Sequence, residues 1–188
     1  MQLLCMLDCL TASRPKSSKP NTIVLCGLSG SGKTVLFYQL RNGSSHQETV
    51  TLMEHNNDTF VLHSELERRA SCCRYSLNSY DRYLYDILTK ATVLKKRVPV
   101  LIFCNKADKV TAHSKEFIKK QLEKEVNKLQ ESRNAISSAD ITDEVQLGVP
   151  GEAFNFSQCP SKVIVAEGAG LTGNVSAVEQ FIREYVKP

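Results

Sequence analysis

The sequence lacks the features of a membrane-spanning, zinc-binding or disulfide-linked protein. No apolar stretch reaches the roughly 18 residues that span a bilayer, because the run at 1–7 stops at Asp8, and no basic n-region precedes that run. The seven cysteines form no Cys-x-x-Cys pair, and the four histidines share no metal-ligand spacing. These absences favour a reduced, cytosolic chain without a membrane span.

The composition is that of one globular domain. The chain has 188 residues, of which 41% are hydrophobic and 23% charged. Its net charge of +4 is small and scattered, so no direct nucleic-acid partner is expected. Residues 1–20 are interpreted as a flexible basic lead-in, and residues 21–188 as the domain.

A phosphate-binding motif, Gly-x-x-x-x-Gly-Lys-Thr, follows the apolar run at 22–26 and precedes a predicted helix at 35–41. Its glycines allow a tight turn whose N–H groups face phosphate oxygens. Lys33 is placed to reach the β- and γ-phosphates, and the Thr34 hydroxyl suits a bridging Mg²⁺. The predicted nucleotide-binding residues here are Gly27, Leu28, Ser29, Gly30, Ser31, Gly32, Lys33 and Thr34.

The tetrapeptide Asn105-Lys106-Ala107-Asp108 indicates which base is bound. It follows the continuous apolar run at 98–104, which is typical of a strand buried on both faces. Asp108 is placed to accept hydrogen bonds from two N–H groups of guanine, and the stem of Lys106 to cover the base. Asn105 bonds either the base or the loop. Because adenine lacks that donor pair, the predicted cofactors are GTP or GDP with Mg²⁺.

The C-terminal half reads as regular α/β sequence. Residues 111–132 predict a helix with Ser114 as its N-cap, and residues 162–166 predict a strand. Residues 137–151 are polar and predict an exposed irregular insertion. The alternation of strands and helices predicts a P-loop NTPase fold, a three-layer α/β sandwich with a mostly parallel sheet.

Two predictions concern the end of the chain. Gly168 and Ala169 follow the strand at 162–166 and are expected to present backbone N–H groups to the guanine O6 atom. The final helix is expected to begin at Ser176, whose spacing to Glu179 is that of a capping box.

Several phrases resemble the β subunit of the signal recognition particle receptor in its plant form, an Arf-like branch of the small GTP-binding proteins. These phrases are 22–37, 83–88, 109–113 and 181–185. The resemblance implies a subunit at the endoplasmic reticulum membrane whose GTP-bound form binds the α subunit, so that the receptor delivers ribosome complexes to the translocation channel. It also implies that Thr51, or alternatively Thr49, is the switch threonine that joins Thr34 at Mg²⁺.

The chain also departs from that family. It has no glycine between Gly43 and Gly148, so the Asp-x-x-Gly motif that reads the γ-phosphate is absent. Residues 68–81 show neither strand alternation nor family likeness. The sheet is therefore expected to be incomplete, with strands and a helix missing between residues 65 and 83 on both sides of the strand at 22–26. Impaired switching, little or no GTPase activity and loss of the family's N-terminal membrane span are expected.

Two other functions stay open. The chain is alternatively an interaction module that does not depend on nucleotide. A P-loop kinase or ATPase is also compatible with the phosphate-binding motif, but that function does not explain Asn105 and Asp108.

Overall fold

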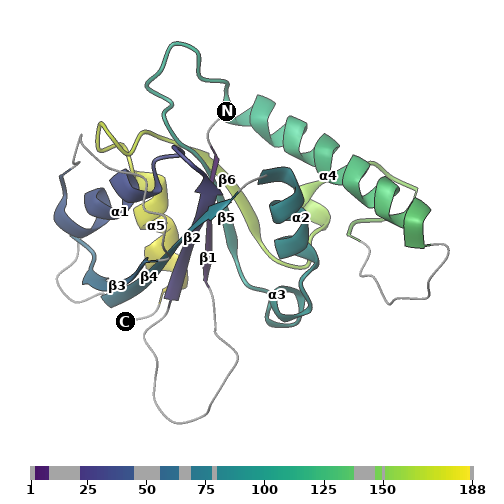
Figure 1. The fold of residues 1–188 in the computed structure, drawn as a ribbon, viewed down its shortest axis with the longest axis horizontal. Coiled ribbons are helices and arrows are strands. Elements are labelled where there is room, and N and C mark those ends of the chain that lie inside the picture. The colour runs from purple at the N-terminus through teal and green to yellow at the C-terminus, as the bar shows by residue number, and fades with distance from the viewer. Residues whose placement is uncertain are drawn as a thin grey trace, which may run out of the picture.

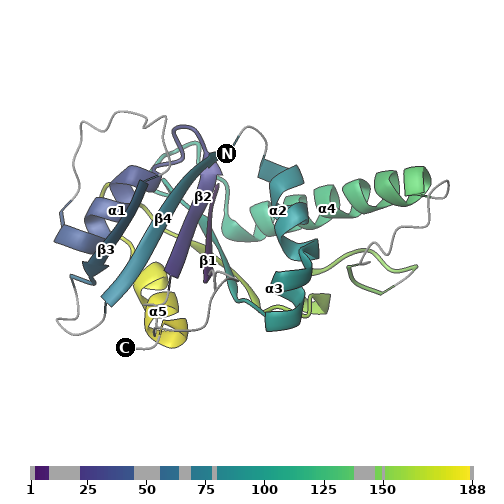
Figure 2. The ribbon, with the colours of Figure 1, turned by 60° about the horizontal axis from the view of Figure 1, so that its bottom comes forward.

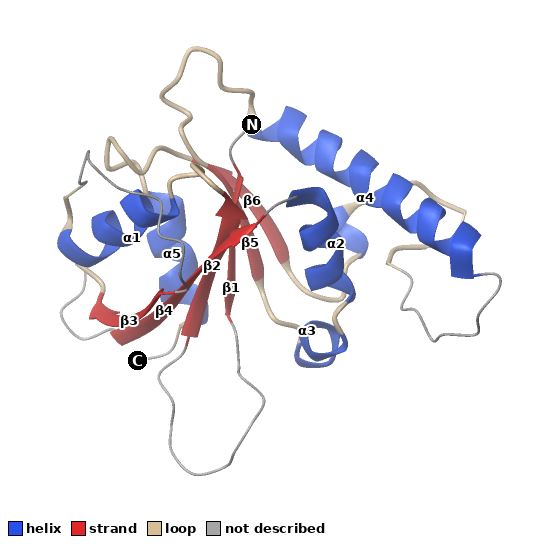
Figure 3. Cartoon of the chain, viewed as in Figure 1, coloured by secondary structure: helices blue, strands red, loops and turns tan. Residues whose placement is uncertain are grey.

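The computed structural model describes residues 3–8, 22–44, 56–63, 69–77, 80–137, 147–149 and 151–186. These residues form three layers, in which a six-stranded sheet lies between two groups of helices (Figures 1 and 3). The predicted three-layer α/β fold is therefore confirmed.

The sheet places both sequence signatures at one edge. Its strands are β1 (Leu3–Asp8), β2 (Thr22–Leu28), β3 (Asn56–Val61), β4 (Arg69–Leu77), β5 (Val100–Cys104) and β6 (Val163–Glu167). Their order across the sheet is β3-β4-β2-β1-β5-β6. Strands β2, β4, β5 and β6 share one direction, and β1 and β3 run against it. The loops that follow β2 and β5 therefore leave the same edge of the sheet.

The segment expected to lack a strand supplies one. Strand β4 pairs in parallel with β2, with Thr22 opposite Ser71 and Leu28 opposite Leu77. The sheet is incomplete, as predicted, but residues 69–77 within the segment expected to lack strands form β4. Strand β4 pairs with β2 on one side and with the antiparallel β3 on the other. This pairing, rather than an alternation of polar and apolar residues, gives β4 its extended conformation.

The predicted lead-in also contains a strand. Strand β1 lies between β2 and β5 and pairs antiparallel with both, Cys5 being opposite Cys26 on one side and Ile102 on the other. The interpretation of residues 1–20 as a flexible lead-in is therefore wrong for residues 3–8. Strand β2 has a hydrogen-bonded neighbour on each side, contrary to the expectation that both were lost.

The helices divide between the two faces of the sheet. They are α1 (Lys33–Asn42), α2 (Tyr80–Thr89), α3 (Ala91–Lys96), α4 (Lys115–Ser137) and α5 (Ser176–Tyr185). Helices α1 and α5 cover one face, and α2, α3 and α4 cover the other (Figures 1 and 2). None of the helices described is long and apolar enough to cross a bilayer.

The core follows the alternation of the central strands. Ile23 and Leu25 of β2 pack with the buried side chains of α1 and α5, while Val24 and Cys26 pack with those of α2 and α4. All five residues of β5 are buried, as its apolar run predicted. The two helical layers therefore clamp the strands that carry the two signatures.

The helix ends test the predicted signals. Helix α1 ends at Asn42, and its C-cap Gly43 has a left-handed φ of 67°, which glycine adopts readily. The Ser114 hydroxyl accepts a hydrogen bond from the Phe117 N–H at 3.3 Å, which confirms the N-cap of α4, but this helix continues past Ser132. The capping box predicted at Ser176 is wrong, because the N-cap is Val175 and no side chain bonds there. The predicted first residue of this helix, Ser176, is confirmed.

Candidate functional site

The phosphate-binding loop joins β2 to α1 at the carboxyl edge of the sheet. Lys33 is the first residue of α1, so the loop leads straight to a helix N-terminus, where backbone N–H groups lack intrahelical acceptors. No acidic residue occupies the first turn of the helix. The positive end of the helix dipole therefore faces the loop, and no carboxylate in the first turn of α1 neutralises it.

Gly32 is required by the shape of the loop. It is the N-cap of α1 and has a φ of 89°, a left-handed conformation that L side chains rarely adopt. A Cβ atom at this position would also collide with Nδ2 of Asn105. The loop and the turn after β5 are thus packed so closely that only glycine fits between them.

The Lys33 ammonium group is folded back onto its own loop. Its Nζ donates hydrogen bonds to the carbonyl oxygens of Gly27 at 2.9 Å and Leu28 at 2.8 Å. It also lies 3.4 Å from the hydroxyl of Ser31, and burial lowers the pKa of Lys33. The cation is therefore held by neutral groups, which an anion at the loop can replace as its partners.

Asn105 connects three segments of the site. Its Nδ2 donates a hydrogen bond to the carbonyl oxygen of Ser31 at 2.8 Å, within the phosphate-binding loop. Its Oδ1 accepts from the N–H of Lys106 and from the N–H of Gly170, both at 2.9 Å. Asn105 is 9% exposed and Ser31 is fully buried, so these bonds are shielded from water. Of the two roles left open for Asn105, the structure shows the bond to the loop.

Lys106 and Asp108 occupy the outer part of the same turn. Lys106 has a φ of 64°, and its Nζ donates to the carbonyl oxygen of Gly30 at 3.0 Å, so its stem crosses the phosphate-binding loop. Partial burial, together with the charge of Lys109, lowers the pKa of Lys106, and Asp108 opposes this shift. Asp108 is exposed. Its carboxylate is accessible to a ligand at this edge.

The loop after β6 is held by hydrogen bonds within the protein, and the contact of Gly168 and Ala169 with guanine stays a prediction. The N–H of Gly168 donates to the carbonyl oxygen of Cys104, and that of Ala169 donates to the carbonyl oxygen of Asn174. In this arrangement both N–H groups are satisfied within the protein, and they brace the loop against β5. Gly170 was not predicted as a site residue, although its N–H donates to Asn105. Its position in the loop directly after β6 is the sequence feature that could have indicated this role.

The close packing of this loop gives a testable difference between two glycines. A Cβ atom at Gly168 would collide with the carbonyl oxygen of Asn174 and lie 2.7 Å from Cζ of Phe103. At Gly170 the nearest atoms are 3.6 Å away, an ordinary contact. We expect Gly168→Ala to lower the free energy of unfolding by about 1–3 kcal/mol. Gly170→Ala should change it by less than about 0.5 kcal/mol.

Urea denaturation followed by circular dichroism measures both variants against the parent chain. Equal midpoints for the two alanine variants would contradict the packing described for the loop.

A pocket of about 270 Å³ adjoins the turn on the side of α4. Its lining includes Asn105, Lys106, His113 and Ile118, and none of the lining residues belongs to the phosphate-binding loop. Cys104 lines it as well; burial, reinforced by the charges of Glu167 and Glu116, raises the pKa of this thiol to about 12. The pocket is thus distinct from the phosphate site, and its cysteine stays protonated at neutral pH.

The structure places only part of the predicted metal site. Thr34 is the second residue of α1 and is partly buried beside Lys33. Thr51 and its alternative Thr49 lie outside the described residues. Among the residues that are described, no group of three or more His, Cys, Asp or Glu side chains is arranged to hold a metal ion.

Strand β2, the glycine-rich loop and helix α1 follow one another in the chain, and the Asn-Lys-x-Asp turn lies at the same edge of the sheet. This arrangement defines the chain as a P-loop α/β protein with the signatures of a GTP-binding domain. Comparison with known proteins narrows this class. The sequence profile of the signal recognition particle receptor beta subunit family matches residues 71–163. That match begins within β4, so the expectation that residues 68–81 lack family likeness is wrong from Ser71 onward.

Similar proteins agree with the profile. The chain is 30% identical to the human signal recognition particle receptor subunit beta over 202 residues, which cover 88% of this chain and 74% of the human protein. The mouse protein is also 30% identical, over 85% of this chain and 74% of its own length. A chain in the structure of the mammalian SRP receptor superposes with a TM-score of 0.71 at 25% identity, over 85% of this chain and 96% of that one. The chain belongs to the family of signal recognition particle receptor beta subunits.

Proposed function

We propose that this chain binds guanine nucleotides, GTP or GDP with Mg²⁺, as the β subunit of a signal recognition particle receptor. The contact between Asn105 and Ser31 carries the proposal, because it joins the phosphate-binding loop to the turn that recognises the base. A solved relative from Chaetomium thermophilum, described as an SRb-GDP-Mg complex, supports the fold, with a TM-score of 0.61 at 19% identity over 89% of this chain.

Each proposed binding residue would contact a different part of the nucleotide or its Mg²⁺. Lys33 would exchange the carbonyl groups of its own loop for phosphate oxygens, which adds charge-assisted hydrogen bonds. Thr34 and Thr51 would supply hydroxyl ligands to a Mg²⁺ that bridges the phosphates. Asp108 would accept two hydrogen bonds from guanine, and the Lys106 stem would lie over the base plane.

The proposed partner is the α subunit of the receptor, at the cytosolic face of the endoplasmic reticulum membrane. Through that subunit the chain would act indirectly on ribosomes and the translocation channel. Family membership supports this role. The absence of any glycine between Gly43 and Gly148 removes the Asp-x-x-Gly turn that senses the γ-phosphate, so we propose weak switching and very slow hydrolysis.

Titration of the purified chain with fluorescent GTP, GDP and ATP in the presence of Mg²⁺ tests nucleotide binding. We expect Asp108→Asn to weaken GTP and GDP binding about a hundredfold, because a carboxylate that accepts two hydrogen bonds contributes about 1.5–3 kcal/mol. ATP should bind about a thousandfold more weakly than GTP to the parent chain, since adenine leaves that carboxylate unpaired.

Lys33→Ala separates nucleotide binding from partner binding. It should weaken binding of all three nucleotides, and capture of purified α subunit should fall as bound guanine nucleotide is lost. Equal affinity of the parent chain for ATP and GTP would contradict the proposal. Undiminished α-subunit capture by Lys33→Ala would instead favour the module that does not depend on nucleotide.

A further inference from the structure

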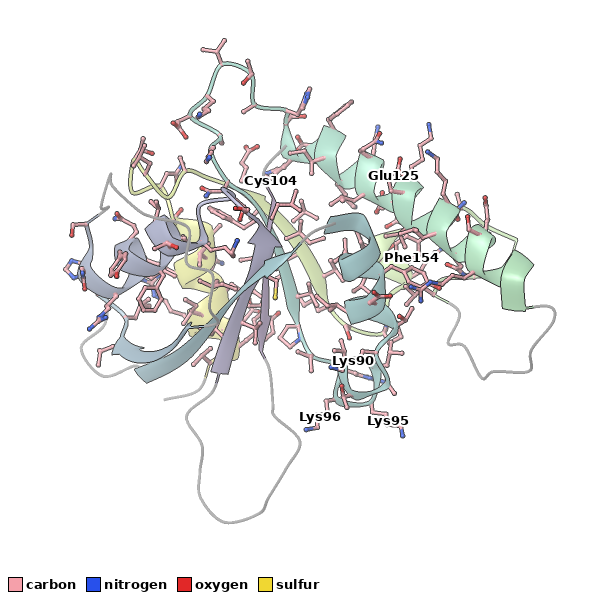
Figure 4. All side chains as sticks on the ribbon, viewed as in Figure 1. Lys90, Lys95, Lys96, Cys104, Glu125 and Phe154 are labelled. Carbon is pink, nitrogen blue, oxygen red and sulfur yellow. The ribbon has the colours of Figure 1, made fainter. Side chains whose placement is uncertain are left out.

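The pocket beside the Asn-Lys-x-Asp turn lies on the α4 side of that turn. Its lining includes Cys104 and Ile118, which belong to the core on the face of the sheet that α4 covers. Helix α1, which follows the phosphate-binding loop, covers the other face. Asp108, Gly168 and Ala169, the residues predicted to contact guanine, are not among the lining residues. Figure 4 shows Cys104 at the carboxyl edge of the sheet, below the loop that leads into α4. The pocket therefore lies beside the candidate nucleotide site rather than within it.

The floor of the pocket is apolar. It is formed by Cys104 and Ile118, which are only 4% and 5% exposed. Because burial raises the pKa of the Cys104 thiol to about 12, this side chain is neutral and acts as a small hydrophobic group. The pocket volume of about 270 Å³ is slightly below the range of about 300–1,000 Å³ that drug-sized ligands fill. The floor therefore suits the apolar part of a small molecule.

The rim of the pocket is cationic. Lys109, Thr111 and His113 are exposed lining residues, and none of the lining residues is an aspartate or a glutamate. Lys106, which the pocket shares with the nucleotide site, also lines it. Burial lowers the pKa of Lys106, the charge of Lys109 lowers it further, and Asp108 opposes this shift without reversing it. The two ammonium groups thus repel each other, and an anion between them would relieve that repulsion.

The carboxylates near the pocket have other positions or partners. Glu167 accepts a hydrogen bond from the N–H of Lys115 at 3.3 Å, and Glu116 lies 3.9 Å from the ammonium group of Lys115. Asp108 is exposed and is not a lining residue. Among the residues that the structure describes, none of the salt bridges involves Lys109. The rim therefore keeps its positive charge.

We propose that this pocket binds a small organic anion with an apolar body. The body would lie against Cys104 and Ile118, where the polarisable sulfur favours an aromatic ring. The anionic group would accept charge-assisted hydrogen bonds from Lys109. Lys106 is less available, because its Nζ already donates to the carbonyl oxygen of Gly30. A solvated surface turn would account for Lys109 but not for the buried apolar floor beside it.

Benzoate is a suitable probe, because it joins an aromatic ring to one carboxylate. The full chain, isotopically labelled in its isoleucine methyl groups and free of nucleotide, is titrated with benzoate and followed by NMR at Ile118. We expect a saturable shift of the Ile118 signal with a Kd of about 1 mM, an ordinary value for so small a ligand. Acetate, which lacks the ring, and benzylamine, whose charge is positive, should bind about tenfold more weakly or worse.

Substitution of Lys109 tests the cationic rim. Lys109→Gln should weaken benzoate binding about tenfold, because it removes the cation that the carboxylate would face, and Lys109→Arg should restore most of the affinity. Lys120→Gln is the matched control, since Lys120 is an exposed lysine of α4 that does not line the pocket. It removes the same charge and should leave the affinity within about twofold of the parent. All three variants should keep the parent's thermal melt.

The proposal is overturned if the Ile118 shift stays linear with benzoate concentration, or if Lys109→Gln and Lys120→Gln bind benzoate equally. Equal binding of acetate and benzoate would reject the apolar body and leave a plain anion site. Competitive displacement of benzoate by GDP with Mg²⁺ would assign the pocket to the nucleotide site and reject a separate one. Because the benzoate titration is made without nucleotide, its result does not depend on the proposed function.

Discussion

Removal of residues 1–8 is expected to abolish the cooperative thermal unfolding transition of the chain. Strand β1 pairs with β2 and β5 along its length and is the hydrogen-bonded link between β3-β4-β2 and β5-β6. Without it, the facing edges of two buried strands would carry unpaired N–H and C=O groups at the centre of the sheet. The total stability of a domain this size is about 5–15 kcal/mol, which such a loss exceeds.

The same deletion should abolish guanine nucleotide binding. The phosphate-binding loop follows β2 and the Asn-Lys-x-Asp turn follows β5, so β1 is the spacer that sets the distance between them. Differential scanning calorimetry and nucleotide titration measure the two effects. A deleted chain that melts cooperatively near the parent's midpoint would show that β1 is dispensable.

A point variant tests β1 without shortening the chain. Cys5 lies in the middle of the strand, opposite Cys26 and Ile102, so Cys5→Pro removes one ladder donor from a central strand. It should destabilise the domain by about 3 kcal/mol or more. Ser13→Pro, which falls outside β1 and two residues before Pro15, serves as the control and should leave the melt unchanged.

The parts of the fold that could be predicted are those whose pattern is local. The loop at 27–34 and the turn at 105–108 have fixed spacings, and α4 shows a helical apolar stripe with a serine at its start. Strand β5 was evident from an apolar run that ends at a polar turn. Each of these signals depends on residues close together in the chain, so no tertiary information was needed.

Strands β1 and β4 could not be predicted because their conformation depends on their neighbours. The sequence of β4, Arg-Ala-Ser-Cys-Cys-Arg-Tyr-Ser-Leu, has no period of two, and its pairing with β2 and β3 imposes the extended form. Strand β1 is a short apolar run near the N-terminus, a pattern that periodicity alone cannot assign. Likewise, the partners of Asn105 are distant in sequence, so the choice between base and loop required the fold.

Asn105→Ala is expected to weaken guanine nucleotide binding about a hundredfold and to lower the free energy of unfolding by about 3 kcal/mol. The substitution leaves the carbonyl oxygen of Ser31 and the N–H of Gly170 buried without partners, and each such group costs about 1–3 kcal/mol. It also removes the contact that holds the phosphate-binding loop against the turn. Urea denaturation and titration with fluorescent GDP measure the two losses.

Two further variants separate the role of Asn105 from stability in general. Asn105→Asp keeps the acceptor for Gly170 but replaces the donor to Ser31 by a carboxylate facing a carbonyl oxygen, so it should lose nucleotide affinity at least as strongly. Asn127→Ala removes the acceptor for the Phe154 N–H, which lies 3.2 Å from Oδ1 of Asn127 in α4. It should lower stability by about 1 kcal/mol and leave nucleotide affinity unchanged. If Asn105→Ala and Asn127→Ala were to lose the same stability and both keep full nucleotide affinity, Asn105 would be an ordinary structural residue, and the two signatures would not act as one site.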